Sequence, residues 1–377
     1  MGASPPSGAV EGNTALLAPG AEPVGSAVDA CAAAASSTDT EAKLRYLQAA
    51  LPAKAGEPVQ RLETHMSWLL LGADRVLKMK KPVRYPFLDF STLEAREHDA
   101  REEDRLNRRL APDVYLGLMA LTWHEGAFSL VPEAQATQTG QTVEWLVAMR
   151  RLPADRMLDR LITDNRLGPH DVDALLGVLL PFYRRAARGA IADDDYVAAL
   201  RAEAAGNRDV LALPHLGLRE AEPVLARMDR ALGLHDADLR QRVREGRIVD
   251  GHGDLRPEHV CLVDPPVVID ALEFDARLRQ VDPFDELGFL GMECAMLGDA
   301  TIGPRLLVGC AEALSDRIDP ALRWLYTARR ALLRARLCAA HLLDDPVARR
   351  EHWLQRSRRY LVIADETLRL LPAVGDR

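Results

Sequence analysis

Two aspartates lie sixteen residues apart in a stretch that alternates apolar runs with a polar turn. Ile248-Val249 leads into the glycine-rich segment Asp250–Arg256, which contains Asp254. The run Val267–Ile269 then leads to Asp270. Short apolar runs of this kind are typical of strands, so two strands are expected to present two carboxylates near one place. Such a pair suits phosphoryl transfer, which depends on positioned acids and a divalent cation.

The residues before position 151 are expected to form a small antiparallel sheet. Short runs of strand-forming residues separated by turn signals predict strands at 59–64, 68–71, 75–80, 115–122, 127–131 and 142–149. Two helices are expected with them, at 42–51 and 91–110. Ser91 followed by Glu94 resembles a capping box and predicts Ser91 as the cap of the second helix.

After Pro153 the pattern becomes helical. Helices are expected at 157–163, 170–188, 194–211, 221–234, 285–298, 302–314, 320–343 and 347–371. A sheet-rich part followed by a helical part predicts an α+β fold with two lobes. The expected domains are a disordered tail rich in Ala, Gly and Pro at 1–40, an N-lobe at 41–151 and a helical C-lobe at 152–377.

Composition narrows the class of protein. The chain has 377 residues, 48% of them hydrophobic, and a net charge of −8, which gives no general attraction to nucleic acid or to an anionic membrane. No apolar run reaches the ~18 residues of a membrane span. The five cysteines are scattered without a Cys-x-x-Cys motif, which favours a reducing cytoplasm over a zinc site or a disulfide framework. The expected partner is a small-molecule substrate, and the oligomeric state stays open.

Several motifs share an order and spacing with a known family. They are Glu63–Trp68, Lys78–Val83, Phe87–Leu93, Arg105–Pro112, Met149–Pro153, His252–Leu255 and Asp270–Asp275. Together they resemble the protein-kinase-like fold of aminoglycoside phosphotransferases, over roughly residues 57–370. The resemblance is greatest to the kinase-like domain of bacterial proteins that in some cases carry a P-loop ATPase domain. No Gly-x-x-x-x-Gly-Lys-Ser/Thr motif for such a domain occurs here.

The resemblance implies a two-lobed fold that uses ATP and Mg²⁺, with Mn²⁺ as an alternative. Asp254 matches the catalytic aspartate, which orients the acceptor hydroxyl and accepts its proton. Asp270 matches the aspartate that holds the metal. Lys78 matches the lysine that contacts the α- and β-phosphates. Glu103 is the expected partner acid on the following helix, with Glu94, Glu97 and Glu102 as alternatives. His252 matches a histidine that braces the catalytic loop.

Three positions depart from the family pattern or carry a weaker signal. Five residues after Asp254, where the family usually has an asparagine that binds a second metal, this chain has His259. Imidazole is a poor Mg²⁺ ligand, so His259 either binds a softer ion, positions phosphate, or weakens the metal site. The chain also lacks a Gly-x-Gly-x-x-Gly loop, and Ser67 with its neighbouring amides is the candidate phosphate contact. Met149 lies where the adenine is expected to meet the backbone.

These residues predict an ATP-dependent phosphotransferase that acts on a hydroxyl of an aminoglycoside-like or other small metabolite. One alternative is a nucleotide-binding pseudokinase with a regulatory role, and another is a metal-dependent hydrolase that uses Asp254, Asp270 and Glu273. Glu273 and Asp275 are either caps or ligands of a metal or a cationic substrate. Asp285 either ties its helix to the catalytic loop or caps that helix. The arginine-rich run 329–336 is expected to make packing contacts and ion pairs.

Overall fold

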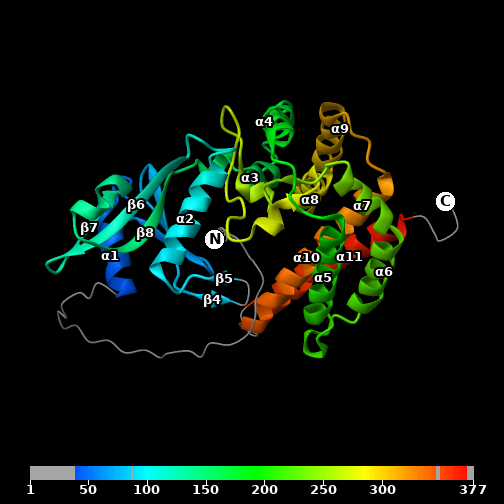
Figure 1. Cartoon of the computed structure of the whole chain (residues 1–377), viewed down its shortest axis with the longest axis horizontal. Coiled ribbons are helices and arrows are strands. Elements are labelled where there is room, and N and C mark those ends of the chain that lie inside the picture. Colours follow the sequence, from blue (N-terminus) through cyan, green and yellow to red (C-terminus); the bar gives the residue numbers. More distant parts are fainter. Residues whose placement is uncertain (1–38, 86–87, 345–348, 372–377) are drawn as a thin grey trace, which may run out of the picture. The chain divides into compact units, whose positions relative to one another are not determined.

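The computed structural model describes residues 39–85, 88–344 and 349–371 (Figure 1). The described residues form two compact units. Unit 1 comprises residues 39–156 and 268–274, and unit 2 comprises residues 157–267 and 275–371. The predicted tail lies outside the described residues except for its last two positions, which begin the first helix. The segment that carries Asp270 therefore groups with the sheet rather than with the helices around it in the sequence.

A six-stranded antiparallel sheet forms the centre of unit 1, with the strand order β1-β2-β3-β8-β6-β7. Its strands are β1 (Gln60–Glu63), β2 (Ser67–Leu71), β3 (Arg75–Lys80), β6 (Tyr115–His124), β7 (Ala127–Pro132) and β8 (Gln141–Arg150). The short strands β4 (Arg84–Tyr85) and β5 (Leu88–Asp89) form a separate pair. The antiparallel sheet that the sequence predicts is confirmed, with every expected strand within a few residues of its place.

Alternation along β3 gives the sheet two different faces. Leu77 and Met79 are buried in an apolar cluster with Leu44 and Leu47 of helix α1 (Thr40–Ala50). Side chains alternate across a strand, so Lys78 and Lys80 lie on the opposite face. Helix α2 (Leu93–Asn107) covers that face, because it carries the carboxylates that both lysines contact.

Helix α2 is polar on its buried side. The buried positions recur at the three- and four-residue spacing of one helix face and are Arg96, Asp99, Ala100, Glu103, Leu106 and Asn107. The cap of this helix is Thr92, whose side chain accepts a hydrogen bond from the Ala95 amide at 3.1 Å. The prediction of Ser91 as the cap is wrong, because the Ser91 hydroxyl instead donates to Asp89. Ser and Thr both favour the cap position, so residue type does not distinguish Ser91 from Thr92. The backbone conformation of the folded chain decides which of them is the cap.

Unit 2 is mostly helical. Its helices are α3 (Leu158–Thr163), α4 (Asp171–Arg185), α5 (Asp193–Leu211), α6 (Ala221–Leu234), α7 (Asp236–Arg244), α8 (Pro283–Leu297), α9 (Ile302–Leu314), α10 (Pro320–Asp344) and α11 (Arg350–Arg369). Helices α10 and α11 run side by side, and with α5 and α6 they enclose one large apolar core (Figure 1). Helix α7, with its short and highly charged sequence, was not predicted.

Short strands flank the candidate catalytic loop. Strand β9 (Val249–Asp250) pairs antiparallel with β12 (Gln280–Val281). The strands β10 (Val260–Cys261) and β11 (Val267–Val268) follow the loop in sequence. The expected short strands before Asp254 and before Asp270 are therefore present. Among the described helices, none combines the length and the apolar character that a membrane crossing requires.

Candidate functional site

Lys78 of β3 contacts two acids of unit 1: Glu103 on helix α2 and Asp270, the candidate metal ligand. Its Nζ lies 2.9 Å from Oε1 of Glu103 and 3.0 Å from Oδ1 of Asp270. Glu103 is completely buried, whereas the Asp270 side chain keeps 16% of its surface exposed. Although burial alone would lower it, the carboxylates of Asp270 and Glu103 hold the pKa of Lys78 well above its usual value. The structure therefore brings three of the sequence-predicted residues together around one charged ammonium group.

Backbone contacts fix the Asp270 segment. Asp270 has a left-handed φ of +63°, which an L-residue adopts only where its surroundings hold it there. The Asp270 amide donates to the Tyr115 hydroxyl at 3.4 Å, and the Ala271 amide donates to Oδ1 of Asn107 at 2.8 Å. The carboxylate of Asp270 is therefore held in a defined direction by β6 and α2.

A second lysine lies beside the first. Lys80 is 2% exposed, and its Nζ lies 2.7 Å from both Asp99 Oδ2 and Glu103 Oε2. It also donates a short hydrogen bond to Glu273. Asp99, Glu103 and Glu273 form the described set of acids whose spacing could hold a metal ion, and the Lys80 ammonium already binds all three.

Ser67 and Met149 are placed in the sheet of unit 1. Ser67 is opposite Lys80 in the β2–β3 register, and its amide donates to the Thr64 hydroxyl at 2.9 Å within the hairpin. The Ser67 amide therefore already donates a hydrogen bond within the β1–β2 turn. Met149 lies near the end of β8, paired with Val76 on one side and Tyr115 on the other. The phosphate contact expected for Ser67 and the adenine contact expected near Met149 stay predictions.

Asp254 follows β9 in unit 2, in a loop where its carboxylate meets Arg256. Oδ2 of Asp254 lies 3.2 Å from Nε of Arg256, whose side chain is completely buried. Although burial alone would raise it, the Arg256 guanidinium holds the pKa of Asp254 below its usual value. Asp254 is therefore a carboxylate at neutral pH and can accept a hydrogen bond or a proton from a hydroxyl.

Both ring nitrogens of His259 are engaged inside this loop. Nδ1 lies 2.8 Å from the backbone oxygen of Asp254, and Nε2 lies 3.3 Å from Nη2 of Arg256. Because Arg256 only donates, Nε2 accepts, and Nδ1–H then donates to the carbonyl of Asp254. Metal binding by His259, as predicted, would compete with one of these contacts, and that role stays a prediction.

Glu286 of α8 holds the start of the loop. Its buried carboxylate accepts hydrogen bonds from the amides of His252 and Gly253 and from the Tyr183 hydroxyl. Gly253 has a φ of +91°, a conformation that favours glycine. His252 in turn accepts a hydrogen bond from the Asp254 amide through Nδ1, at 3.3 Å. The bracing geometry expected of His252 is thus present.

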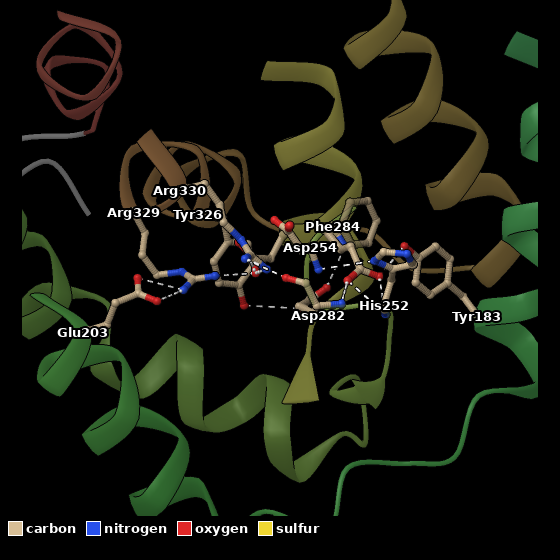
Figure 2. Close-up of polar contacts among 12 residues, drawn as sticks. Tyr183, Glu203, His252, Asp254, Asp282, Phe284, Tyr326, Arg329 and Arg330 are labelled. Carbon is tan, nitrogen blue, oxygen red and sulfur yellow. Dashed lines mark hydrogen bonds and ion pairs between the residues drawn. The ribbon is translucent and has the colours of Figure 1, made fainter. Parts of the chain in front are cut away.

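Asp285 reaches the same loop through an arginine. Arg329 and Arg330 of α10 both bind its buried carboxylate, and Arg330 also donates to the backbone oxygen of Gly253 at 3.3 Å (Figure 2). Although burial alone would raise it, these two guanidinium groups hold the pKa of Asp285 below its usual value. The cap of α8 is Asp282, which accepts from the Phe284 amide at 3.0 Å. Of the two roles considered for Asp285, the link to the loop is present and the capping role is wrong.

Sequence reasoning missed several of these contacts. Glu286, Asn107 and Tyr115 were not assigned these roles, because each meets a backbone amide that is distant in sequence. Arg256 lies only two residues after Asp254, and its ion pair was overlooked. Asp275 caps the short 3₁₀ helix Ala276–Arg279 by accepting from the Arg277 amide, as one of its two readings expected. The arginine-rich run makes the expected ion pairs; the ones shown are Arg329–Glu203, Arg330–Asp285 and Arg334–Glu293.

Asp270 suits a magnesium ion, whereas the acid cluster beside it does not. Asp270 offers hard carboxylate oxygens on a partly exposed side chain, and Mg²⁺ is commonly held by one or two carboxylates together with substrate phosphates. The cluster at Lys80 does not fit in this arrangement, since an ammonium group already binds its three acids. Among the described acids that Lys78 or Lys80 contacts, Asp270 is therefore the one whose surroundings suit Mg²⁺.

Comparison with solved structures decides the fold. A choline/ethanolamine kinase family protein from Mesorhizobium loti superposes with a TM-score of 0.50 at 16% identity, covering 87% of this chain and 98% of that one. The chain has a protein-kinase-like fold. A choline kinase from Cryptosporidium parvum aligns over 88% of this chain and 97% of its own, with a TM-score of 0.44 and 11% identity. In this protein-kinase-like fold, the sheet belongs to unit 1 and the long helices belong to unit 2.

Comparison of sequences finds relatives in two mycobacteria. Uncharacterised proteins of Mycobacterium tuberculosis and Mycobacterium bovis are each 32% identical over 322 residues, or 81% of this chain. The chain spans 59% of the length of these curated relatives. No model of a protein family matches the chain.

Proposed function

We propose that this chain transfers the γ-phosphate of ATP to a hydroxyl group of a small molecule. One observation carries the proposal: the Lys78 ammonium bridges a buried helix glutamate and the partly exposed carboxylate of Asp270. A lysine held in this way offers fixed positive charge for phosphate oxygens beside an acid suited to Mg²⁺.

The donor side of the reaction is assigned to unit 1. Lys78 binds phosphate oxygens of ATP, and Glu103 keeps the ammonium pointing toward them. Asp270 would hold Mg²⁺ or Mn²⁺, and a metal bound there would supply positive charge to the phosphates. These groups act mainly by position and charge, which is how catalysts of phosphoryl transfer work.

The acceptor side is assigned to Asp254 in unit 2. Its carboxylate accepts the hydrogen bond of the acceptor hydroxyl and takes up the proton as the oxygen attacks. A bond forms between that oxygen and the γ-phosphorus, and the bond from the γ-phosphorus to the bridging oxygen of ADP breaks. Arg256 and the braced loop keep Asp254 ionised and oriented before the substrate binds. The use of ATP favours the cytoplasm as the place of the reaction.

A regulatory pseudokinase is the second candidate function. It is motivated by His259, which stands where a second metal ligand is expected and is occupied within its own loop. Such a protein binds ATP without transferring phosphate. The metal-dependent hydrolase is disfavoured by the contact of Glu273 with Lys80, which leaves that acid paired with an internal cation.

ATP consumption by the full chain tests the proposal. Purified protein is incubated with Mg²⁺-ATP and a panel of amino alcohols, sugars, aminoglycosides and nucleosides, and ADP is measured. We expect one class of hydroxyl compound to stimulate ADP release, with phosphate recovered on that compound. ATP binding without stimulation by any compound, in either Mg²⁺ or Mn²⁺, favours the pseudokinase.

Thermal stability separates the hydrolase from both nucleotide-binding functions. A ligand that binds only the folded state at about 100 times its Kd stabilises that state by about 2.7 kcal/mol. We therefore expect a non-hydrolysable ATP analogue with Mg²⁺ to raise the Tm. Metal binding with no rise on adding the analogue contradicts the proposal and supports a hydrolase.

A further inference from the structure

Lys80 has no role in the proposed chemistry, yet it is the most completely buried lysine of unit 1. Its Nζ contacts three carboxylates that come from two separate segments. Asp99 and Glu103 lie four residues apart on one face of α2, and Glu273 lies on the segment that carries Asp270. An ammonium with three donors can bind three acceptors at once, and here all three are charged or chargeable acids.

The two lysines divide the Glu103 carboxylate between them. Oε1 of Glu103 binds Lys78 at 2.9 Å, and Oε2 binds Lys80 at 2.7 Å. A carboxylate held by both oxygens cannot rotate without breaking a buried ion pair, which is costly where water cannot replace the partner. The direction in which Glu103 points toward Lys78 therefore depends on Lys80.

The segment of Asp270 is fixed at its other end by the same ammonium. The Asp270 and Ala271 amides are bound by Tyr115 and Asn107, and Glu273, three residues after Asp270, is bound by Lys80. Charge supports this link. Although burial alone would lower it, the carboxylates of Asp99, Glu103 and Glu273 hold the pKa of Lys80 above its usual value, so its ammonium stays charged among the three acids.

We propose that Lys80 is a positioning residue that ties α2 to the Asp270 segment, so that Lys78, Glu103 and Asp270 are in place before nucleotide arrives. In this arrangement, helix α2 does not have to move when ATP binds, because Lys78, Glu103 and Asp270 are already together. The inference rests on the proposed function for its effect on ATP, but its structural part concerns the free protein and is tested separately.

Hydrogen exchange of the free full-length chain tests the structural part. We expect Lys80→Met to lower protection of amides in residues 93–107 and 268–274 by about tenfold or more, because both segments lose the same anchor. Lys80→Arg keeps the charge and is expected to restore part of this protection. Lys81→Met is the matched control: its ammonium pairs with the exposed Glu63, so protection of both segments is expected to stay unchanged.

Glu273→Gln tests the contact of Lys80 with the Asp270 segment separately from its contacts with α2. This variant also provides a test if Lys80→Met does not fold. It weakens the tie to residues 268–274 and leaves Asp99 and Glu103 with Lys80. We expect protection to fall in 268–274 and to hold in 93–107. Unchanged protection of 268–274 in both Glu273→Gln and Lys80→Met, or equal loss throughout unit 1, overturns the inference.

Nucleotide kinetics supply the readout that a purely structural role would not change. We expect Lys80→Arg to raise the KM for Mg²⁺-ATP by about tenfold with a smaller effect on kcat, because donor groups are displaced and Asp254 is not. A tenfold fall in kcat with no change in KM would contradict the proposal that Lys80 positions Lys78, Glu103 and Asp270. If the wild-type chain binds no ATP, the proposed function fails, and the exchange data still decide whether Lys80 ties the two segments together.

Discussion

The ring of His259 makes hydrogen bonds within the catalytic loop, although its position in the sequence predicted a metal ligand. The histidine stands where a metal-binding asparagine was expected, but its ring joins the backbone of Asp254 to Arg256. A ring engaged at both nitrogens braces the loop, and an oxygen-preferring ion gains little from imidazole. We therefore regard His259 as a brace for Asp254.

The variant His259→Ala separates bracing from metal binding. We expect turnover to fall by about tenfold or more because Asp254 loses its support. The affinity for Mn²⁺ in the presence of an ATP analogue, followed by electron paramagnetic resonance, is expected to change by less than about threefold. His170→Ala, at an exposed position, is the control. A large loss of Mn²⁺ affinity would make His259 a metal ligand instead.

Single residues with a fixed place in a motif were predictable from the sequence. Lys78, Glu103 and Asp270 meet as expected, and alternation along β3 puts Lys80 on the same face as Lys78. The partners of Lys80 were not predictable, because its long side chain reaches acids on separate segments whose distance in sequence carries no pattern. The partners of Arg256 lie two residues away on either side and could have been considered from the sequence. Metal and phosphate roles depend on ligands outside the sequence and stay predictions.

At the scale of elements, helix α2 shows why apolar periodicity did not reveal which face of a helix is buried. Its buried face is built from charged and amide side chains, so no apolar periodicity marks which side packs on the sheet. Arg96 meets Glu144 of β8 through two parallel hydrogen bonds of 2.9 Å, and this pair orients the helix. The helix itself was predictable from its turn signals, but the side it buries was not.

The start of α2 provides a test of the observed cap. We expect Thr92→Ala to lower the free energy of unfolding by about 1 kcal/mol, because the Ala95 amide loses its acceptor. Ser91→Ala is expected to cost less than about 0.5 kcal/mol, since its hydroxyl contacts only Asp89 at the surface. Urea denaturation of both variants measures the difference. A larger loss for Ser91→Ala would restore the capping role to Ser91.

The link between α8 and α10 predicts a pH dependence. Asp285 has a pKa held below its usual value by Arg329 and Arg330, so the unfolded chain binds its proton at higher pH than the folded chain. Its contribution to stability is therefore present above the usual aspartate pKa and is lost as the pH falls through the lower folded value.

Asp285→Asn tests this dependence. We expect a loss of about 3 kcal/mol at pH 7, because two buried guanidinium groups keep only part of their partner. The difference from wild type should shrink as the pH falls below about 4. Asp164→Asn, at an exposed helix end, is the control. A difference that stays constant across this pH range would contradict the assigned pKa direction.

At the scale of the whole molecule, composition and element order were enough to predict an α+β fold with a sheet-rich and a helical part. The grouping of residues 268–274 with the sheet was not predictable from order along the chain, since helices surround that segment on both sides in sequence. It follows from contacts with β3, β6 and α2, which only the folded chain brings together.

The central claim is that this chain transfers phosphate with Asp254 as the catalytic acid–base group. The most direct measurement is the rate of phosphate transfer from Mg²⁺-ATP by wild type and by Asp254→Asn, with Asp164→Asn as the control. We predict a fall of about 10²–10⁴-fold for Asp254→Asn at nearly unchanged affinity for an ATP analogue. Equal rates for wild type and Asp254→Asn would contradict the account.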